Sequence, residues 1–394
     1  MKKLIISNFI IQSENKTKDI FSNIINLIFL ISLTLVLTIG RTYPLNFIAN
    51  ASFIVMSILM LIYTKLFGSF FLDRFVILIL LINMFFFISS ILNGFVGESF
   101  TLTFLTMGII PSYFYFKSSL LSRKIAINYL TFAYIAFNLF FLSIYSKELF
   151  GFDFTNRLGD KIANQNDIAT YLLTAHSIYF YLIIKKHYYL LPLLLLNGVQ
   201  MISTGSRSGL LNILIMSSLI AYILIGKKRK VSFIITTVGL LTGFYLILFI
   251  PELASLQDRF HDLFLEIFTG QRKDVSTSNR INLLFESVEF FIKNPLFGGG
   301  RTFASKYTFD GNVAHNAFVE IAASYGIFVM SLFVLLFTFP LYQKNNRLLD
   351  LKITLIMSFV IFFFTLSGYY YKAPYYILPI LATLDEKSNY SSLS

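Results

Sequence analysis

Residues 75–92 read FVILILLINMFFFISSIL and contain no Asp, Glu, Lys or Arg. An apolar run of about 18 residues or more crosses the ~30 Å hydrocarbon core of a bilayer as a helix, because a helix bonds its backbone N–H and C=O groups internally. Residues 24–38 and 233–250 are equally free of charge. A helix from a soluble core would show a polar face, and these stretches show none. The chain is therefore predicted to be an integral membrane protein.

The composition of the whole chain agrees with this prediction. Hydrophobic residues make up 56% of the 394 positions and charged residues 13%, whereas a soluble domain carries about 25% charged residues. The chain contains no cysteine, which excludes a disulfide framework and a thiolate nucleophile. The net charge of +12 is explained by basic loops at the cytoplasmic surface, so no nucleic-acid partner is expected.

Hydropathy predicts an all-α fold, a polytopic transmembrane helical bundle of about 12 spans with a helical extracytoplasmic loop. Residues 1–394 are expected to form a single membrane domain. The first span has no small-residue cleavage site after it and is interpreted as uncleaved. The last span is short and contains Pro374 and Pro379, which leaves eleven spans as the alternative. The predicted spans are 21–39, 44–63, 75–92, 99–116, 125–145, 165–184, 188–203, 209–225, 231–250, 315–339, 352–367 and 370–384.

Basic residues are distributed unevenly between the connections. Connections on the side of the N-terminus carry Lys65, Arg74, Lys117, Arg123, Lys124, Lys185, Lys186, Lys227–Lys230, Lys344, Arg347 and Lys352. Short connections on the other side carry Arg41, Arg207 and Lys372, and the longer segment 146–164 carries Lys147, Arg157 and Lys161. The positive-inside rule therefore predicts that both termini lie in the cytoplasm.

Residues 251–314 form the one long connection, and it is predicted to lie outside the cytoplasm. Apolar residues recur there at helical spacing in two stripes, Leu256, Phe260, Leu263, Phe264 and Ile267, then Ile281, Leu284, Phe285, Val288, Phe291 and Ile292. The second stripe follows a Ser-Thr-Ser cluster at 276–278 and stops at Asn294–Pro295. We interpret the two amphipathic helices as a lid over the bundle; the alternative is that they only rest at the membrane interface.

Arg207 is the clearest candidate for a functional residue. It lies in the turn Ser203-Thr-Gly-Ser-Arg-Ser-Gly209, where Ser206 and the backbone offer donors and a span begins. A guanidinium matches phosphate geometry, and a helix N-terminus favours anions. The alternative is that Arg207 snorkels or pairs with a carboxylate. Asn166, in the polar start 164–167 of the sixth span, is predicted on the same side; that cluster alone reads as a helix cap.

Arg280 and a glycine run form a second candidate region. Arg280 begins the second lid helix, where it opposes the helix dipole, so it is either solvated or directed at an anion. Residues 294–301 read NPLFGGGR, and such glycines allow the close backbone approach that a phosphate loop needs. Gly299 and Arg301 are therefore candidate substrate-binding residues. The run lacks Gly-Lys-Ser/Thr, which excludes a nucleotide site of that class.

His315, Asn316 and Glu320 lie where the long connection re-enters the membrane. Histidine accepts a proton near neutral pH, which suits a general base. Residues 316 and 320 share one helix face, and 315 lies on another. The alternative for His315 is a cap or an interfacial residue. His176, His187 and His261 are assigned no function.

These motifs resemble, in order, the O-antigen polymerase and O-antigen ligase superfamily of bacterial membrane glycosyltransferases. The resemblance rests on Thr204–Gly209, Arg280, the NPLFGGG stretch, and Ala314-His-Asn-Ala-Phe-Val-Glu320 with Gly326 behind it. It covers about residues 160 to 335. The first five spans match only in hydropathy.

The resemblance implies metal-independent glycosyl transfer at the outer face of the bacterial cytoplasmic (inner) membrane. The donor would be an oligosaccharide linked through pyrophosphate to undecaprenol, and no cofactor is expected. By position, Arg207 and Arg280 would hold the pyrophosphate and His315 would activate the acceptor hydroxyl. Candidate substrate-binding residues are Ser206, Asn316, Glu320, Arg301, Gly299 and Asn166. A polysaccharide chain-length regulator is a candidate partner.

The predicted function is a polymerase of repeat units for O-antigen or capsule. The first alternative is an O-antigen ligase, which transfers the glycan to the lipid A core; the NPLFGGG stretch favours the polymerase. A lipid-linked oligosaccharide flippase is the alternative from another class, but it would need charges inside the spans, which are nearly free of them. A proton-coupled transporter is also disfavoured, because it would need carboxylates inside the membrane spans.

Overall fold

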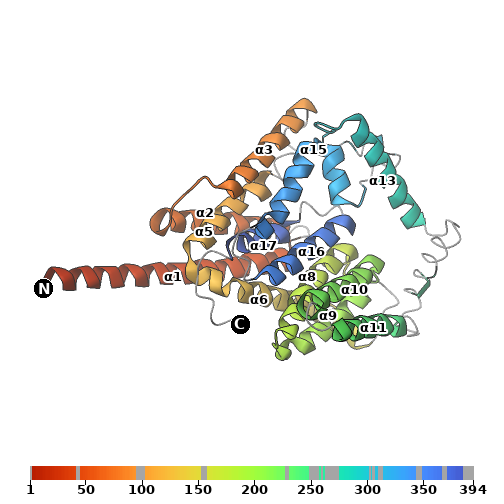
Figure 1. Ribbon diagram of the computed structural model, residues 1–394, viewed down its shortest axis with the longest axis horizontal. Helices are drawn as coiled ribbons and strands as arrows, with labels where there is room; N and C mark the ends of the chain where they lie inside the picture. The colour runs from red at the N-terminus through yellow and green to blue at the C-terminus, as the bar shows by residue number, and fades with distance from the viewer. Residues whose placement is uncertain are drawn as a thin grey trace.

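The computed structural model describes residues 2–40, 45–94, 103–151, 158–226, 230–247, 275–300, 314–342, 348–365 and 371–384, with residues 257–258, 261, 303 and 307–308 between them. Every regular element in this described part is a helix (Figure 1), as predicted. The first helices are α1 (Lys2–Thr38), α2 (Asn46–Phe67), α3 (Arg74–Leu92), α5 (Ile109–Ser118), α6 (Leu120–Ile144), α7 (Ser146–Phe150) and α8 (Gln165–Ile184). They are followed by α9 (Leu191–Ser203), α10 (Arg207–Ala221), α11 (Lys230–Ile247), α13 (Val275–Lys293), α15 (Ala317–Thr338), α16 (Leu349–Thr365) and α17 (Lys372–Thr383).

Seven stretches of described helix are long and apolar enough to cross a membrane, so the predicted count of about twelve is not confirmed. Of the five other predicted spans, four coincide with shorter helices: α5 has 10 residues, α9 has 13, α16 has 17 and α17 has 12. The fifth, 231–250, coincides with α11, which has 18 residues and is not among the seven. At 1.5 Å per residue, α17 is about 18 Å long, well short of the ~30 Å hydrocarbon core. The seven are Lys16–Thr38, Asn46–Phe67, Arg74–Leu92, Ile125–Ile144, Gln165–Ile184, Arg207–Ile225 and Ala317–Tyr342.

The short helix α17 lies inside the bundle, against α5 and α1. All its residues from Ala373 to Thr383 are buried. The hydroxyl of Tyr376 lies 2.5 Å from the hydroxyl of Ser32, and its ring packs 5.7 Å from Phe29 and 5.1 Å from Phe53, between ring centroids. A helix buried on all sides needs apolar residues on all sides. This is why residues 370–384 resemble a membrane span in composition.

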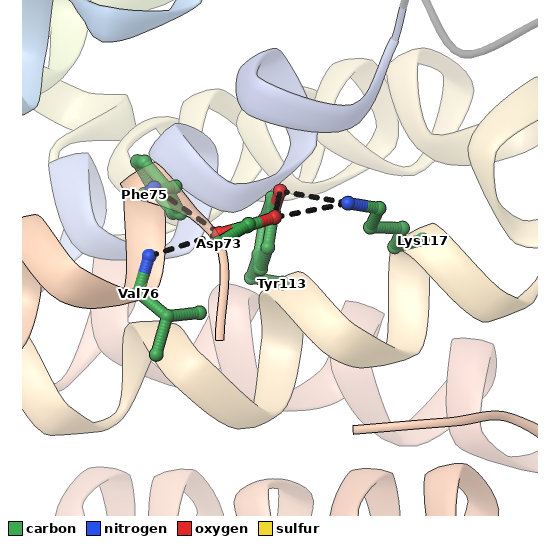
Figure 2. A network of polar contacts seen from close by, with 5 residues as sticks. All are labelled: Asp73, Phe75, Val76, Tyr113 and Lys117. Carbon is green, nitrogen blue, oxygen red and sulfur yellow. Dashed lines mark hydrogen bonds and ion pairs between the residues drawn. The ribbon is translucent and has the colours of Figure 1, made fainter. Parts of the chain in front are cut away.

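A network of hydrogen bonds and an ion pair links the start of α3 to α5, as Figure 2 shows. One carboxylate oxygen of Asp73 caps α3 by accepting from the N–H groups of Phe75 and Val76, both at 3.1 Å. The other accepts from the Tyr113 hydroxyl at 2.5 Å and the Lys117 ammonium at 2.9 Å. Burial alone would raise the pKa of Asp73, but hydrogen bonds from Tyr113, Lys117 and the Val76 N–H outweigh it, and the pKa lies below its usual value.

Helix α13 contains the second predicted amphipathic stripe and packs against α15. Leu283 and Ser287 are buried, whereas Ile281, Phe285 and Ile292 are exposed. The helix begins at Val275, so the Ser-Thr-Ser cluster at 276–278 lies in its first turn and not ahead of it, and Arg280 lies in its second turn. The apolar residues of the first predicted stripe, Leu256, Phe260, Leu263, Phe264 and Ile267, lie outside the described residues.

Helix α15 is broken at Gly326, which has φ +86° and ψ 179°. The two halves diverge at this break in Figure 1. The span predicted as continuous over 315–339 therefore consists of two helical halves.

Candidate functional site

The turn before α10 is tied to the start of α8. Ser206 is the N-cap of α10, where its buried side-chain oxygen accepts from the Gly209 N–H at 3.2 Å. The same hydroxyl donates to the side-chain oxygen of Asn166 at 3.1 Å. A Cβ added at Gly209 would lie 2.9 Å from the Cβ of Ala169, so α10 packs closely on α8 here. The two helix N-termini are therefore held side by side.

Arg207 is the first residue of α10, directly after this cap, and its side chain is partly exposed. The preceding Gly205 has φ +58°, a left-handed conformation that glycine adopts without steric cost. The turn therefore places a guanidinium at the N-terminus of the helix it begins. Both features favour an anion at this position.

Asp167, which follows Asn166 in α8, links helix α17 to this region. Asp167 is only 4% exposed, and its carboxylate accepts a hydrogen bond from the Tyr371 hydroxyl, at the start of α17. The Tyr371 ring stacks on Phe362 of α16, with 5.3 Å between ring centroids. The beginnings of α8 and α17 are thus joined through a buried carboxylate.

His315 and Asn316 form the entry to α15. The Asn316 side-chain oxygen accepts from the N–H groups of Phe318 and Val319, both at 3.1 Å, so Asn316 is the N-cap. His315 has φ +48°, in the left-handed region that few residues other than glycine adopt. Such backbone strain persists only where the surroundings impose it, and it is common at functional sites. The cap thus fixes the backbone beside a partly exposed imidazole.

The C-terminal end of α16 connects this entry to α10. The Asn316 side-chain N–H group lies 3.4 Å from the Phe364 carbonyl oxygen, and the Asn212 amide of α10 lies 3.4 Å from the Thr365 hydroxyl. Four helix beginnings, those of α8, α10, α15 and α17, therefore gather at one end of the bundle, around the end of α16. Each helix N-terminus carries a partial positive charge, so this end of the bundle suits an anionic ligand.

The glycine run packs against the break in α15. The N–H groups of Gly299 and Gly300 donate to the Ala323 and Ser324 carbonyls at 2.9 and 2.8 Å, and the Ile327 N–H donates to the Pro295 carbonyl at 2.8 Å. These bonds satisfy backbone groups at the break in α15. The Gly299 N–H is engaged in this way, and the role of Gly299 as a substrate contact stays a prediction.

The remaining predicted site residues are less closely connected. Arg280 is partly exposed on α13, which packs on α15, and its position relative to Arg207 stays a prediction. Glu320 is buried one turn after Asn316. Arg301 lies outside the described residues.

Asp167, Tyr371 and Asn212 contribute to this region but were not predicted as functional residues. A carboxylate near the start of an apolar span was the available signal for Asp167. The sequence around Tyr371 and Asn212 gave no signal of a function, because their importance depends on partners more than 150 residues away in the chain. Within the described residues, no group of three or more His, Cys, Asp or Glu side chains is placed to hold a metal ion.

Comparison with known families identifies one match. The model of the O-antigen ligase family matches residues 192–334, from α9 to α15. The search of curated proteins finds no match. The family match includes Arg207, Arg280 and His315, and it supports membership of the O-antigen ligase and polymerase superfamily, as the sequence predicted.

Proposed function

We propose that this chain, as a membrane enzyme of the O-antigen ligase and polymerase type, polymerises lipid-linked oligosaccharide repeat units at the outer face of the bacterial cytoplasmic membrane. The donor is a glycan carried on undecaprenyl pyrophosphate. The observation that carries the proposal is the gathering of four helix N-termini around Arg207 and the His315–Asn316 entry. This arrangement is suited to a diphosphate beside a proton acceptor.

The diphosphate is held by positive charge from side chains and backbone. The Arg207 guanidinium pairs with phosphate oxygens, and the N-terminus of α10 adds its dipole. Arg280 supplies a second guanidinium from α13. Because negative charge grows on the phosphate oxygen as it leaves, these groups stabilise the transition state more than the ground state.

His315 acts as the general base. Its imidazole accepts the proton of the acceptor hydroxyl while the hydroxyl oxygen forms a bond to the anomeric carbon of the donor sugar. The bond between that carbon and the phosphate oxygen breaks, and the diphosphate leaves on its lipid carrier. Direct displacement of this kind inverts the anomeric centre. Asn316 is a positioning residue, because its cap fixes the backbone that carries His315.

The proposal is tested by the amount and length of glycan made in cells. Arg207→Ala, Arg280→Ala and His315→Ala should each abolish long-chain glycan while the protein still inserts. Arg207→Lys should also be impaired, because an ammonium cannot pair in bidentate fashion. Arg74→Ala is the matched control, since Arg74 is also the first residue of a helix, in α3, and directly follows its N-cap. Normal glycan in all three alanine variants would show that the site is wrongly assigned.

Ligase activity is the second candidate, because the matched family is described as O-antigen ligase. The two activities differ in the acceptor, which is another lipid-linked repeat unit for a polymerase and the lipid A core for a ligase. A deletion strain distinguishes them. Single repeat units on the lipid A core indicate a lost polymerase, whereas polymer on undecaprenol with bare core indicates a lost ligase.

A further inference from the structure

A polar pocket lies beside the Ser206–Arg207 turn and is not used by the steps above. It measures about 210 Å³ and is lined by Gly40 after α1, Asn46 at the start of α2, and Ala163, Asn164 and Asp167 at the start of α8. Three segments that are far apart in the sequence thus contribute to one cavity. Asn46, Asn164 and Asp167 give its lining three polar side chains.

The pocket contains a fixed hydrogen-bond acceptor. Asp167 is 4% exposed, and its carboxylate accepts from the Tyr371 hydroxyl, whose ring is held by stacking on Phe362. A carboxylate has about four lone-pair sites, so it can accept further hydrogen bonds from a ligand. Because its position is set in advance, less conformational entropy is lost when a ligand binds.

The described residues of the lining favour a ligand rich in hydroxyl groups. The Asp167 carboxylate in the lining repels phosphate. The Asn46 and Asn164 amides can each donate and accept hydrogen bonds, which matches a hydroxyl group that does both. A sugar ring has this pattern of hydroxyl groups, and a diphosphate does not.

The location connects the pocket to the proposed transfer. Asn166 lies between Asn164 and Asp167 in the first turn of α8, and it accepts the hydrogen bond from Ser206, next to Arg207. The geometry points to a site that binds a sugar residue of the glycan substrate, with Asp167 as the principal acceptor, while the diphosphate lies at Arg207. This inference rests on the proposed function and deepens it.

Binding of a glycan without its carrier tests the inference separately from catalysis. The probe is the repeat-unit oligosaccharide of the host strain, released from its lipid and added to the purified full-length protein in nanodiscs. Saturation-transfer NMR should detect binding to the wild type and to Arg207→Ala, because the probe lacks the diphosphate. Asp167→Asn and Asn46→Ala should weaken binding about tenfold through lost hydrogen bonds. Asn50→Ala is the matched control, one turn along α2 and exposed.

Transfer kinetics then identify the source of the sugar. If the pocket binds the donor glycan, Asp167→Asn raises KM for the lipid-linked donor; if it binds the acceptor, KM for the acceptor rises. In either case kcat should fall less than KM rises. Equal binding of the probe by wild type, Asp167→Asn and Asn46→Ala, or no binding by the wild type, would overturn the inference even if Arg207→Ala abolished transfer. Failure of the proposed function would instead appear as normal glycan in the Arg207, Arg280 and His315 variants.

Discussion

The Ser206 hydroxyl donates a 3.1 Å hydrogen bond to the side-chain oxygen of Asn166, 40 residues earlier in the chain. The same oxygen of Ser206 accepts from the Gly209 N–H at 3.2 Å. One hydroxyl therefore both caps α10 and joins it to α8. Since Arg207 follows directly, the placement of its backbone depends on this pair of bonds.

Ser206→Ala removes both bonds, and we expect it to reduce stability and transfer together. Loss of an N-cap costs about 0.5–2 kcal/mol in the free energy of unfolding. Transfer should fall by about tenfold or more, because small displacements of a charged group weaken transition-state stabilisation. The measurements are the fraction of protein that stays monodisperse after heating in detergent, and the rate of glycan transfer by the purified protein.

The control for this change is Ser143→Ala. Ser143 is an exposed serine of α6 whose hydroxyl donates to the Phe140 carbonyl within its own helix. It should leave both stability and transfer within error of the wild type. Unchanged transfer in Ser206→Ala would contradict a role for the cap in positioning Arg207.

Gly326→Ala should disrupt the break in α15 that the glycine run fills. At φ +86° an alanine is strained by about 1–3 kcal/mol, and its Cβ would lie 2.0 Å from the Leu296 carbonyl oxygen. We expect a large loss of folded protein at 37 °C, measured by yield and by monodispersity. Gly198→Ala in α9 is the matched control, because a Cβ there meets nothing within 4 Å and alanine favours a helix. Equal yields of the two variants would show that the break tolerates a side chain.

Local sequence patterns located the long helices but could not establish which apolar segments cross the membrane. Charge-free runs correctly predicted α1, α2 and α3 because a long lipid-facing helix must be apolar. The same composition occurs in α17, which is apolar because protein surrounds it. Hydropathy shows that a segment lacks polar groups. A helix needs such a composition whether it is surrounded by protein or by lipid, so hydropathy alone does not distinguish the two.

The candidate site was predictable only where one short motif carries the chemistry. Arg207, Ser206 and Asn316 lie at helix starts, as their sequence motifs indicated. The role of the glycine run was not predictable, because its partners are the carbonyls of Ala323 and Ser324, more than 20 residues later in the chain. A run of glycines indicates close approach of backbone but does not identify what approaches.

The orientation in the membrane can be tested because the chain contains no cysteine. A single introduced cysteine is then the only site for a membrane-impermeant maleimide. Lys147→Cys in α7 should react in intact spheroplasts, since Lys147 is exposed and predicted to lie outside the cytoplasm. Lys185→Cys, exposed at the opposite end of α8, should react only after permeabilisation. The reverse pattern would place the Arg207 end of the bundle in the cytoplasm and exclude the proposed reaction there.

The Asp73 network should make stability depend on pH without affecting transfer. Because the folded-state pKa of Asp73 is lowered, its carboxylate contributes stability above the unfolded pKa of about 3.9, and that contribution is lost as the pH falls through the folded-state pKa. Asp73→Asn retains a good capping residue but loses the ion pair with Lys117. We therefore expect the variant to be less stable than the wild type by about 1 kcal/mol at pH 7, with the difference shrinking as the pH falls below about 3.9.

Thermal unfolding in detergent from pH 3 to pH 7 measures this difference, and Glu289→Gln provides the control. Glu289 pairs with Lys293 at 2.7 Å, but both side chains are 68% exposed, so water screens the pair and its loss should not change stability measurably. A stability difference for Asp73→Asn that stayed constant down to pH 3 could not come from the carboxylate charge. It would instead indicate that the asparagine side chain fails to reproduce the cap on Phe75 and Val76.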